Sequence, residues 1–234
     1  MLSVFDLLAA KTLDLDLAAY LMARISRGAS FMVGSVPPGA GKTTVMCALL
    51  NFVPVDFPLI AATPEAVYKA SKVAASPRAC YICHEIGSGP YFAYLWSDAL
   101  RAYCRLSENG HMLATNLHAD DLNEAKDQVC GDNDVRQEHF NRFDLLIFLR
   151  IEGTYLKSHR RIEKVYSSDG LSGHVLVFDG GNNKKVETKI NNHMAEPDYV
   201  GACRDFIKKI APKTRTIEQT RRQVVEFLAH NLSM

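Results

Sequence analysis

Short apolar runs alternate with helical patterns along the first two thirds of the chain. Five runs are too short for a helix and do not alternate with polar residues; they lie at 31–33, 59–62, 80–83, 112–114 and 145–149. Such unalternating runs are typical of parallel strands buried on both faces. Helical spacing of apolar residues predicts helices at 7–25, 44–52 and 92–106. Strands that alternate with helices predict a three-layer α/β domain with a mainly parallel sheet.

The pattern changes after residue 151. Two β-like runs, 161–166 and 174–178, flank a turn-rich segment and predict an antiparallel hairpin. Two helical patterns follow, at 197–210 and 216–232. We therefore predict a core over residues 1–151 and a C-terminal extension over residues 152–234, in which the hairpin and the helices pack on that core.

The charge balance indicates no obligatory polyanionic partner. Lysine and arginine number 27 and aspartate and glutamate 26, for a net charge of +1, so we expect no nucleic acid ligand. The longest apolar-leaning stretch, 51–62, is broken by prolines and an aspartate and is far shorter than the ~20 residues of a membrane-spanning helix. Any membrane association is therefore expected to be peripheral, through a partner.

Cysteine usage favours a reducing, cytoplasmic location. Six cysteines occur without regular spacing, and the chain opens without a charged-then-apolar signal segment. Cys80, Cys83 and His84 are close enough in sequence to suggest metal ligands, but no second close pair follows. Because alternate residues of a strand point to opposite faces, Cys80 and Cys83 are interpreted as buried thiols rather than zinc ligands.

The strongest motif is a phosphate-binding loop. Residues 34–44 read GSVPPGAGKTT, follow a predicted strand and open a predicted helix, which is the context of a Walker A motif. The glycines let backbone N–H groups approach phosphates, Lys42 reaches the β- and γ-phosphates, and the Thr43 hydroxyl binds Mg²⁺. Val36 stands where the motif usually begins with glycine. The predicted nucleotide-binding residues are Pro38, Gly39, Ala40, Gly41, Lys42, Thr43 and Thr44.

Two later strands end in residues suited to ATP hydrolysis. Hydrolysis requires a carboxylate that orients a water molecule beside the γ-phosphate, and Glu85 closes the strand predicted at 80–83. Glu85 is also a candidate for the Mg²⁺ site. His118 follows the strand at 112–114, where an imidazole could contact the γ-phosphate. Taken alone, a histidine in the position of His118 is more often a loop or core residue than a phosphate sensor.

Together these segments resemble a known family. A Walker A loop, a strand ending in Glu85-Ile86, an aromatic-rich helix and the stretch NGHMLATNLHADDLNEA are similar to the secretion-superfamily ATPases, the motors of type II and IV secretion, type IV pili and archaella. The resemblance covers about residues 13–149, and GHMLATNLHA is its most specific part. It implies a RecA-like P-loop NTPase core that hydrolyses ATP with Mg²⁺.

The resemblance also implies roles and partners. It makes Glu85 the Walker B carboxylate, His118 the histidine of the family's histidine box, and Glu65 the glutamate of its acidic box. We therefore expect Glu85, His118 and Glu65 to be catalytic. It further implies a homo-oligomer, typically a hexameric ring, that moves or assembles secretion- or pilus-type protein subunits.

Several features depart from the family pattern. About thirty residues precede the loop, so we expect the family's separate N-terminal domain, with its arginines, to be missing. Arg78 is the single arginine between Glu65 and Cys80, and His84 and Gly87 replace the family's glycine and arginine around Glu85. Arginine stabilises the charge that develops in phosphoryl transfer, so we expect slow turnover without a partner or an oligomer.

Two other functions remain open. The chain could be a nucleotide-binding regulatory or assembly module with little or no turnover, which the missing arginines favour and the retained Glu85 and His118 do not. A small-molecule kinase would need an arginine-rich lid, and the pairs Arg160-Arg161 and Arg221-Arg222 are instead interpreted as surface charge.

Overall fold

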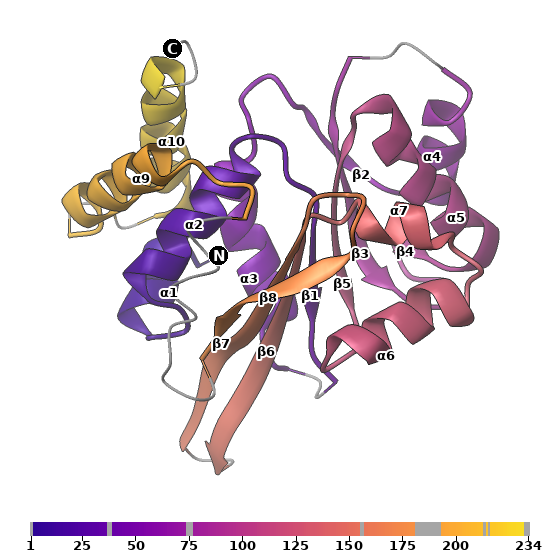
Figure 1. The fold of residues 1–234 in the computed structure, drawn as a ribbon, viewed down its shortest axis with the longest axis horizontal. Helices are drawn as coiled ribbons and strands as arrows, with labels where there is room; N and C mark the ends of the chain where they lie inside the picture. The colour runs from indigo at the N-terminus through magenta and orange to yellow at the C-terminus, as the bar shows by residue number, and fades with distance from the viewer. Residues whose placement is uncertain are drawn as a thin grey trace.

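The computed structural model describes residues 2–36, 39–73, 77–154, 157–180, 193–212, 214 and 216–231. The strands are β1 (Phe31–Gly34), β2 (Leu59–Ala61), β3 (Cys80–Ile86), β4 (Tyr94–Leu95), β5 (Met112–Leu117), β6 (Leu145–Thr154), β7 (Lys157–Ser168) and β8 (His174–Asp179). They form one sheet in the order β2-β3-β5-β1-β6-β7-β8, with β4 beside β3 (Figure 1). From β2 to β6 all pairs are parallel, and β7 and β8 add antiparallel strands.

Helices cover both faces of this sheet. They are α1 (Val4–Ala9), α2 (Leu15–Ile25), α3 (Lys42–Leu49), α4 (Pro64–Ala70), α5 (Ser97–Arg105), α6 (Leu122–Lys126), α7 (Gln137–Asn141), α9 (Pro197–Ile210) and α10 (Ile217–Asn231). Alternate residues of β1 enter different cores: Phe31 and Val33 pack with α1, α2, α3, α9 and α10, whereas Met32 packs with α4, α5 and α7. The predicted three-layer, RecA-like α/β fold with a mainly parallel sheet is therefore confirmed.

The strand order positions the carboxyl ends of three strands together. β5 lies between β1 and β3, so the strand that leads into the phosphate loop is separated by one strand from the strand that carries Glu85. Gly34 at the end of β1 pairs with Phe148, so β6 continues for six further residues, 149–154, past that edge. The β6–β7 hairpin therefore overhangs the loop edge, and Figure 1 shows it projecting beyond the other strands.

The predicted N-terminal helix is interrupted. Instead of one helix over 7–25, α1 ends at Ala9 and α2 begins at Leu15. Lys11 adopts a left-handed backbone with φ of 57°. The Asp14 side chain then accepts a hydrogen bond of 2.8 Å from the Leu17 N–H and caps α2. The apolar spacing continues across the break, which is why periodicity alone missed it.

The helix expected at 92–106 is also shorter than predicted. Tyr94 and Leu95 form β4 beside β3, Trp96 has the extended backbone of a cap residue, and α5 begins only at Ser97. Phe92, the first residue of the expected helix, is 72% exposed. The expected helix at 44–52 is α3, which begins two residues earlier, at Lys42, and ends in a 3-10 turn over Leu50–Phe52.

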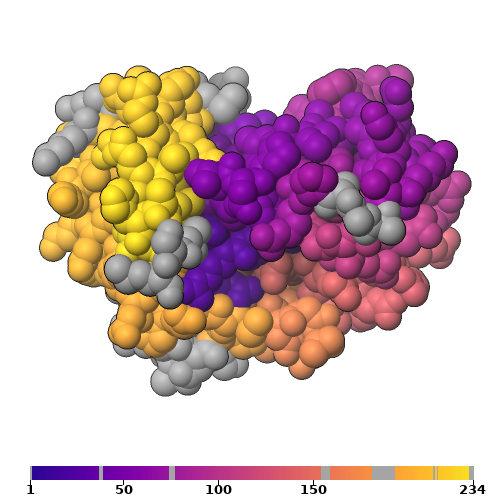
Figure 2. Space-filling model, turned by 90° about the horizontal axis from the view of Figure 1, so that it is seen from above, coloured from indigo at the N-terminus to yellow at the C-terminus, as the bar shows by residue number. Residues whose placement is uncertain are grey.

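The C-terminal extension shares the sheet of the core. β6 crosses the predicted boundary at residue 151, and β7 and β8 form the expected antiparallel hairpin. The α9 helix packs on α2, where Tyr199 Oη lies 2.9 Å from Ser26 Oγ. Figure 2 shows the yellow C-terminal helices lying against the indigo and purple N-terminal segments. In the described part of the chain, no helix has the length and apolarity needed to cross a membrane.

In the pair Arg221-Arg222, which was interpreted as surface charge, Arg222 is exposed but Arg221 is not. Arg221, on α10, is half-buried and donates hydrogen bonds of 2.7 Å to the Asn51 carbonyl and 2.5 Å to the Val53 carbonyl. Its guanidinium therefore caps the end of the 3-10 turn after α3. The two carbonyls come from a segment 168 to 170 residues earlier in the chain, a contact that no local pattern could predict.

Candidate active site

The phosphate loop has the backbone geometry that an anion site requires. β1 leads into the loop and α3 leaves it, as predicted. Gly39 and Gly41 have φ of 79° and 96°, in the left-handed region that favours glycine. Gly41 occupies the N-cap of α3 and makes no side-chain cap bond, so the first N–H groups of the helix are open to a ligand.

The entry of the loop is held by an aspartate. The Val36 N–H donates a hydrogen bond of 2.7 Å to Asp120 Oδ1, which follows β5. This contact uses only the backbone of residue 36, so valine can stand where the motif usually has glycine. Pro38, one of the predicted nucleotide-binding residues, lies outside the described residues.

Lys42 points back into the loop from the first position of α3. Its residue is only 8% exposed, and Nζ donates to the Ser35 carbonyl at 3.0 Å. Nζ also lies 3.1 Å from His118 Nδ1 and 3.7 Å from Glu85 Oε1. Burial lowers the pKa of Lys42, while the Glu85 charge acts in the opposite direction. The lysine therefore joins the three strand ends into one polar cluster.

Glu85 is a buried carboxylate at the carboxyl end of β3. It is 5% exposed, and Oε1 lies 3.9 Å from His118 Nε2 in addition to its ion pair with Lys42. Both distances exceed hydrogen-bonding range, and Glu85 Oε1 has no hydrogen-bond partner among the described residues. Burial raises the pKa of Glu85, because the nearby lysine does not fully offset the loss of solvation.

Asn116 belongs to the same cluster, although sequence analysis did not identify it. It pairs with Val33 in the sheet, and its Nδ2 donates to the His84 carbonyl at 2.8 Å and to Thr43 Oγ1 at 3.4 Å. Its Oδ1 is buried with no hydrogen-bond partner in the described chain. The sequence could have indicated Asn116, because it lies two residues before His118 at the end of the same strand.

The oxygen atoms of this cluster fit Mg²⁺ in kind. Mg²⁺ prefers oxygen ligands, usually one or two protein groups together with water and phosphate oxygens. Thr43 offers a hydroxyl, Glu85 a carboxylate and Asn116 an amide oxygen. Two of these oxygens, Glu85 Oε1 and Asn116 Oδ1, are buried and unpartnered within the described residues. Unsatisfied buried oxygens are costly, so their concentration at one place indicates a polar or cationic ligand.

Arg160 is a second residue that sequence analysis missed. It lies on β7, and its Nε donates a hydrogen bond of 3.0 Å to the Gly39 carbonyl. Its Cδ would lie 3.5 Å from a Cβ placed on Gly41. The pair Arg160-Arg161 was interpreted as surface charge, but the overhang of the hairpin brings Arg160 onto the phosphate loop. No sequence signal links residues that lie 121 positions apart.

Glu65 is not brought into this cluster. It lies exposed in the first turn of α4, after the edge strand β2, and two strands separate β2 from β1. Among the described residues it makes no hydrogen bond or ion pair with Lys42, Glu85 or His118. Its catalytic role stays a prediction.

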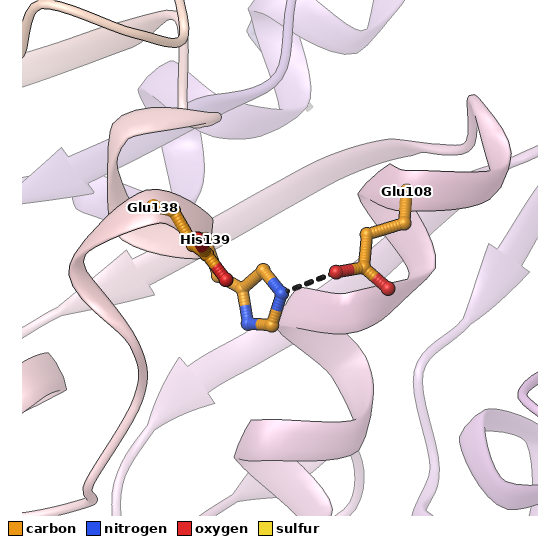
Figure 3. A group of neighbouring side chains, drawn as sticks. All are labelled: Glu108, Glu138 and His139. Carbon is orange, nitrogen blue, oxygen red and sulfur yellow. Dashed lines mark hydrogen bonds and ion pairs between the residues drawn. The ribbon is translucent and has the colours of Figure 1, made fainter.

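A second cluster with ligand-type side chains lies at the other end of the sheet (Figure 3). Glu108, Glu138 and His139 place one ligand atom each within 4.8 Å of one another. However, Arg136 Nη2 lies 3.0 Å from Glu108 Oε1 and 2.7 Å from His139 Nε2. The guanidinium already supplies the positive charge that a metal ion would bring, so this cluster is interpreted as an ion-paired structural group.

The two strand cysteines are buried on opposite sides of the sheet. Cys80 packs in the core on the α2 and α3 side, and Cys83 packs in the core on the α5 side. Burial raises the pKa of each thiol to about 12. This placement agrees with the interpretation as buried thiols.

The solved structures that are similar to this chain include three of low sequence identity. The VirB11 ATPase from the Brucella suis type IV secretion system, in complex with sulphate, is 16% identical with a TM-score of 0.49, over 65% of this chain and 52% of that chain. The ATPase DotB from Legionella pneumophila is 11% identical with a TM-score of 0.47, over 92% of this chain and 62% of that chain. The ATPase DotB from Yersinia pseudotuberculosis is 10% identical with a TM-score of 0.43, over 94% of this chain and 62% of that chain.

This chain thus covers only 52% to 62% of the length of these structures. They include a type IV secretion ATPase, the class of protein that the sequence resembles. No protein-family model matches the sequence, and no curated protein matches it. The assignment of the site rests on the loop, the strand order and the polar cluster described above.

Proposed function

We propose that this chain binds ATP with Mg²⁺ on the loop at 34–44 and hydrolyses it slowly. One observation carries the proposal: at the carboxyl edge of the sheet, Lys42 Nζ lies 3.1 Å from His118 and 3.7 Å from the buried Glu85, whose Oε1 has no hydrogen-bond partner among the described residues. A buried lysine and an unsatisfied carboxylate beside an open helix N-terminus are the groups that a metal–triphosphate would satisfy.

Each residue has a proposed role. Backbone N–H groups of Gly39, Ala40, Gly41 and Thr44 hold the phosphate oxygens, and Lys42 exchanges its contact with the Ser35 carbonyl for the β- and γ-phosphates. Pro38, just before them in sequence, stays a predicted nucleotide-binding residue.

The metal site would use the Thr43 hydroxyl and the Glu85 carboxylate, with the amide oxygen of Asn116 nearby. Mg²⁺ bound there would neutralise charge on the phosphates.

Glu85 is also proposed as the group that orients and deprotonates the attacking water. Its pKa is raised by burial, which makes it a better proton acceptor than an exposed glutamate. His118 is half-exposed beside Lys42, where it would contact the γ-phosphate and report its presence. The hydrogen bond of Asn116 to the His84 carbonyl fixes the backbone just before Glu85.

Turnover is expected to be slow. An arginine that reaches the transferred phosphate typically contributes roughly 10³- to 10⁵-fold in rate. In the described chain Arg160 is an arginine that contacts the phosphate loop, and its hydrogen bond goes to the Gly39 carbonyl, whereas the groups near Glu85 are Lys42 and His118. The remaining charge would have to come from a neighbouring copy or a partner.

The resemblance to secretion and pilus motors supports a role in moving or assembling a protein partner, as a homo-oligomer that is hexameric in that family. A regulatory or assembly module with little turnover is the second candidate. The exposed position of Glu65, away from Lys42 and Glu85, favours this second candidate.

Phosphate release and molecular mass should be measured together, by an enzymatic phosphate assay and light scattering on the same samples. We expect release that requires Mg²⁺, rises with assembled mass and is lost in Lys42→Ala, with Lys69→Ala on the exposed face of α4 as control. ATP binding without release at any mass would favour the module. Fast release from a monomer would contradict the account of the missing charge.

A further inference from the structure

The β6–β7 hairpin forms a wall beside the phosphate loop. β6 continues past the end of β1, and β7 returns along it, with Arg160 paired to Ile151 in the overhanging part. The Arg160 side chain crosses to the loop and binds the Gly39 carbonyl through Nε. The outer nitrogens of its guanidinium make no hydrogen bond or ion pair among the described residues, so they are available to a ligand.

Neighbouring arginines of the same hairpin are neutralised, whereas Arg160 is not. Arg150 forms an ion pair of 2.8 Å with Glu163, and Arg161 forms one of 2.6 Å with Glu152. No carboxylate of the described chain lies within ion-pair distance of Arg160. An unneutralised guanidinium against a phosphate loop is suited to bind phosphate oxygens, because its planar donors match them in pairs.

A cavity of about 370 Å³ opens on the same side of the loop. Its floor is the backbone of Gly39 to Gly41 with Thr44 and Val45 of α3, and its walls are α1 and β7. This volume falls within the roughly 300–1,000 Å³ typical of small-molecule sites. Leu7 of α1 and Ala10, which directly follows α1, give it an apolar wall, and Thr12 adds a hydroxyl.

The position of the cavity relative to the polar cluster indicates which part of a nucleotide it could bind. Lys42, Glu85 and His118 mark the end of the loop where the γ-phosphate would lie, and none of them lines the cavity. The cavity instead meets the loop at Gly41 and Thr44, on the side from which the rest of a nucleotide would leave. An apolar space there suits a base and a ribose better than a further charged group.

We infer that the hairpin and α1 complete the nucleotide site: the cavity receives the nucleoside of a nucleoside triphosphate, and Arg160 binds its phosphate chain. This inference rests on the proposed function, since it requires a nucleotide on the loop. It assigns to the C-terminal hairpin a direct part in ligand binding and makes α1 the apolar wall of the base and ribose pocket.

The contribution of the nucleoside to binding can be distinguished from that of the phosphates by comparing two ligands, ATP and inorganic tripolyphosphate. Each is titrated into the protein with Mg²⁺ and followed by calorimetry. Ala10→Phe fills the cavity from an exposed position, and Ala9→Phe is the matched control because Ala9 is exposed on α1 but does not line the cavity. We expect Ala10→Phe to weaken ATP by roughly tenfold or more and to leave tripolyphosphate within about twofold of the wild type. Ala10→Leu should give an intermediate loss.

Arg160→Ala tests the phosphate contact, with Arg150→Ala as the control that removes a neutralised arginine from the same hairpin. We expect Arg160→Ala to weaken both ligands by roughly 10- to 100-fold, since it removes charge-assisted bonds to phosphate. Arg150→Ala should bind both ligands as the wild type does.

The outcomes distinguish the inference from the proposed function. Wild-type affinity of Lys42→Ala for both ligands would overturn the proposed function itself. If Lys42→Ala binds neither ligand but Ala10→Phe binds ATP normally, the nucleoside lies elsewhere and the inference is wrong. If Arg160→Ala binds tripolyphosphate as Arg150→Ala does, Arg160 does not contact the phosphates.

Discussion

Two clusters at opposite ends of the sheet are built from the same kinds of side chain. At the amino-terminal edge, before β5 and β6, Glu108 Oε1 lies 2.7 Å from His139 Nε2 and 3.0 Å from Arg136. At the carboxyl edge, Glu85 lies 3.7 Å from Lys42 and 3.9 Å from His118. Each cluster combines a carboxylate, a histidine and a cation, but only in the first is the carboxylate held by short contacts to the other two groups.

The two clusters differ in whether the carboxylate has hydrogen-bond partners, not in the kinds of side chain present. The hydrogen bond from His139 lowers the pKa of Glu108, whereas burial raises the pKa of Glu85. Glu85 and Asn116 also keep buried oxygens without hydrogen-bond partners in the described chain. A carboxylate that is stabilised inside its own fold is a structural element, and one left unstabilised at the carboxyl edge of a parallel sheet is placed for a ligand.

The largest expected contrast is in turnover. Glu85→Gln removes the proton acceptor and should lower the rate of ATP hydrolysis by roughly 10²- to 10⁴-fold while ATP binding is retained. The same substitution at the other end, Glu108→Gln, should leave the rate unchanged. Steady-state phosphate release on matched samples measures both. Equal effects of the two substitutions would remove the functional distinction between the clusters.

Stability should respond in the reverse order. His139 is 3% exposed and bonded to Glu108, so His139→Ala should lower the free energy of unfolding by about 1–3 kcal/mol. The side chain of His118 is 49% exposed, and His118→Ala should stay within about 0.5 kcal/mol of the wild type. Urea denaturation gives both values. A larger loss at His118 would indicate that the carboxyl-edge cluster holds the fold together.

Substitutions should alter the Mg²⁺ dependence of ATP binding only in the cluster at the carboxyl edge. Thr43→Ala removes a proposed metal ligand and should weaken ATP binding by roughly tenfold in Mg²⁺, equivalent to about 1.4 kcal/mol, with little change in EDTA. Arg136→Ala, at the amino-terminal edge, should leave the Mg²⁺ dependence unchanged. Calorimetric titrations in the two buffers give the comparison, and a loss in Thr43→Ala that persists in EDTA would argue against the metal role.

The smallest expected effect is that the two carboxylates change the folding stability with pH in opposite directions. The lowered pKa of Glu108 contributes stability above the ordinary glutamate pKa, and this is lost as pH falls through its folded-state value. The raised pKa of Glu85 acts oppositely, with stability present at low pH and lost as pH rises through its folded-state value.

In EDTA, therefore, Glu108→Gln should fall below the wild type in unfolding free energy as pH rises toward the ordinary glutamate pKa of about 4.3, and it should stay below the wild type at higher pH. Glu85→Gln should gain relative to the wild type as pH rises from about 4.3 through the raised folded-state pKa of Glu85. Denaturation curves between acid and neutral pH test the signs, and two curves that move in the same direction would contradict the contrast between the clusters.

The sequence predicted the parts of the site that depend on local order. The phosphate loop follows from glycines between a strand and a helix, and the placing of Glu85 and His118 follows from the rule that ligands gather at carboxyl ends of parallel strands. The same reasoning could have included Asn116, which shares the end of β5 with His118.

The remaining features depend on tertiary structure. Arg160 reaches the loop only because β6 overhangs β1, and Arg221 reaches its carbonyls only because α10 packs beside the turn after α3. The break between α1 and α2 depends on the capping bond of Asp14 within a continuing apolar pattern. Glu65 was placed by resemblance alone, and the strand order leaves it away from Lys42.

The most direct test of the central claim is equilibrium binding of ATP·Mg²⁺ to the wild type and to Lys42→Ala, with Lys69→Ala as control. We predict saturable binding with one nucleotide per chain in the wild type and in the control, and a loss of affinity of at least roughly 100-fold in Lys42→Ala. Equal affinity of the wild type and Lys42→Ala would contradict the assignment of this loop as the nucleotide site.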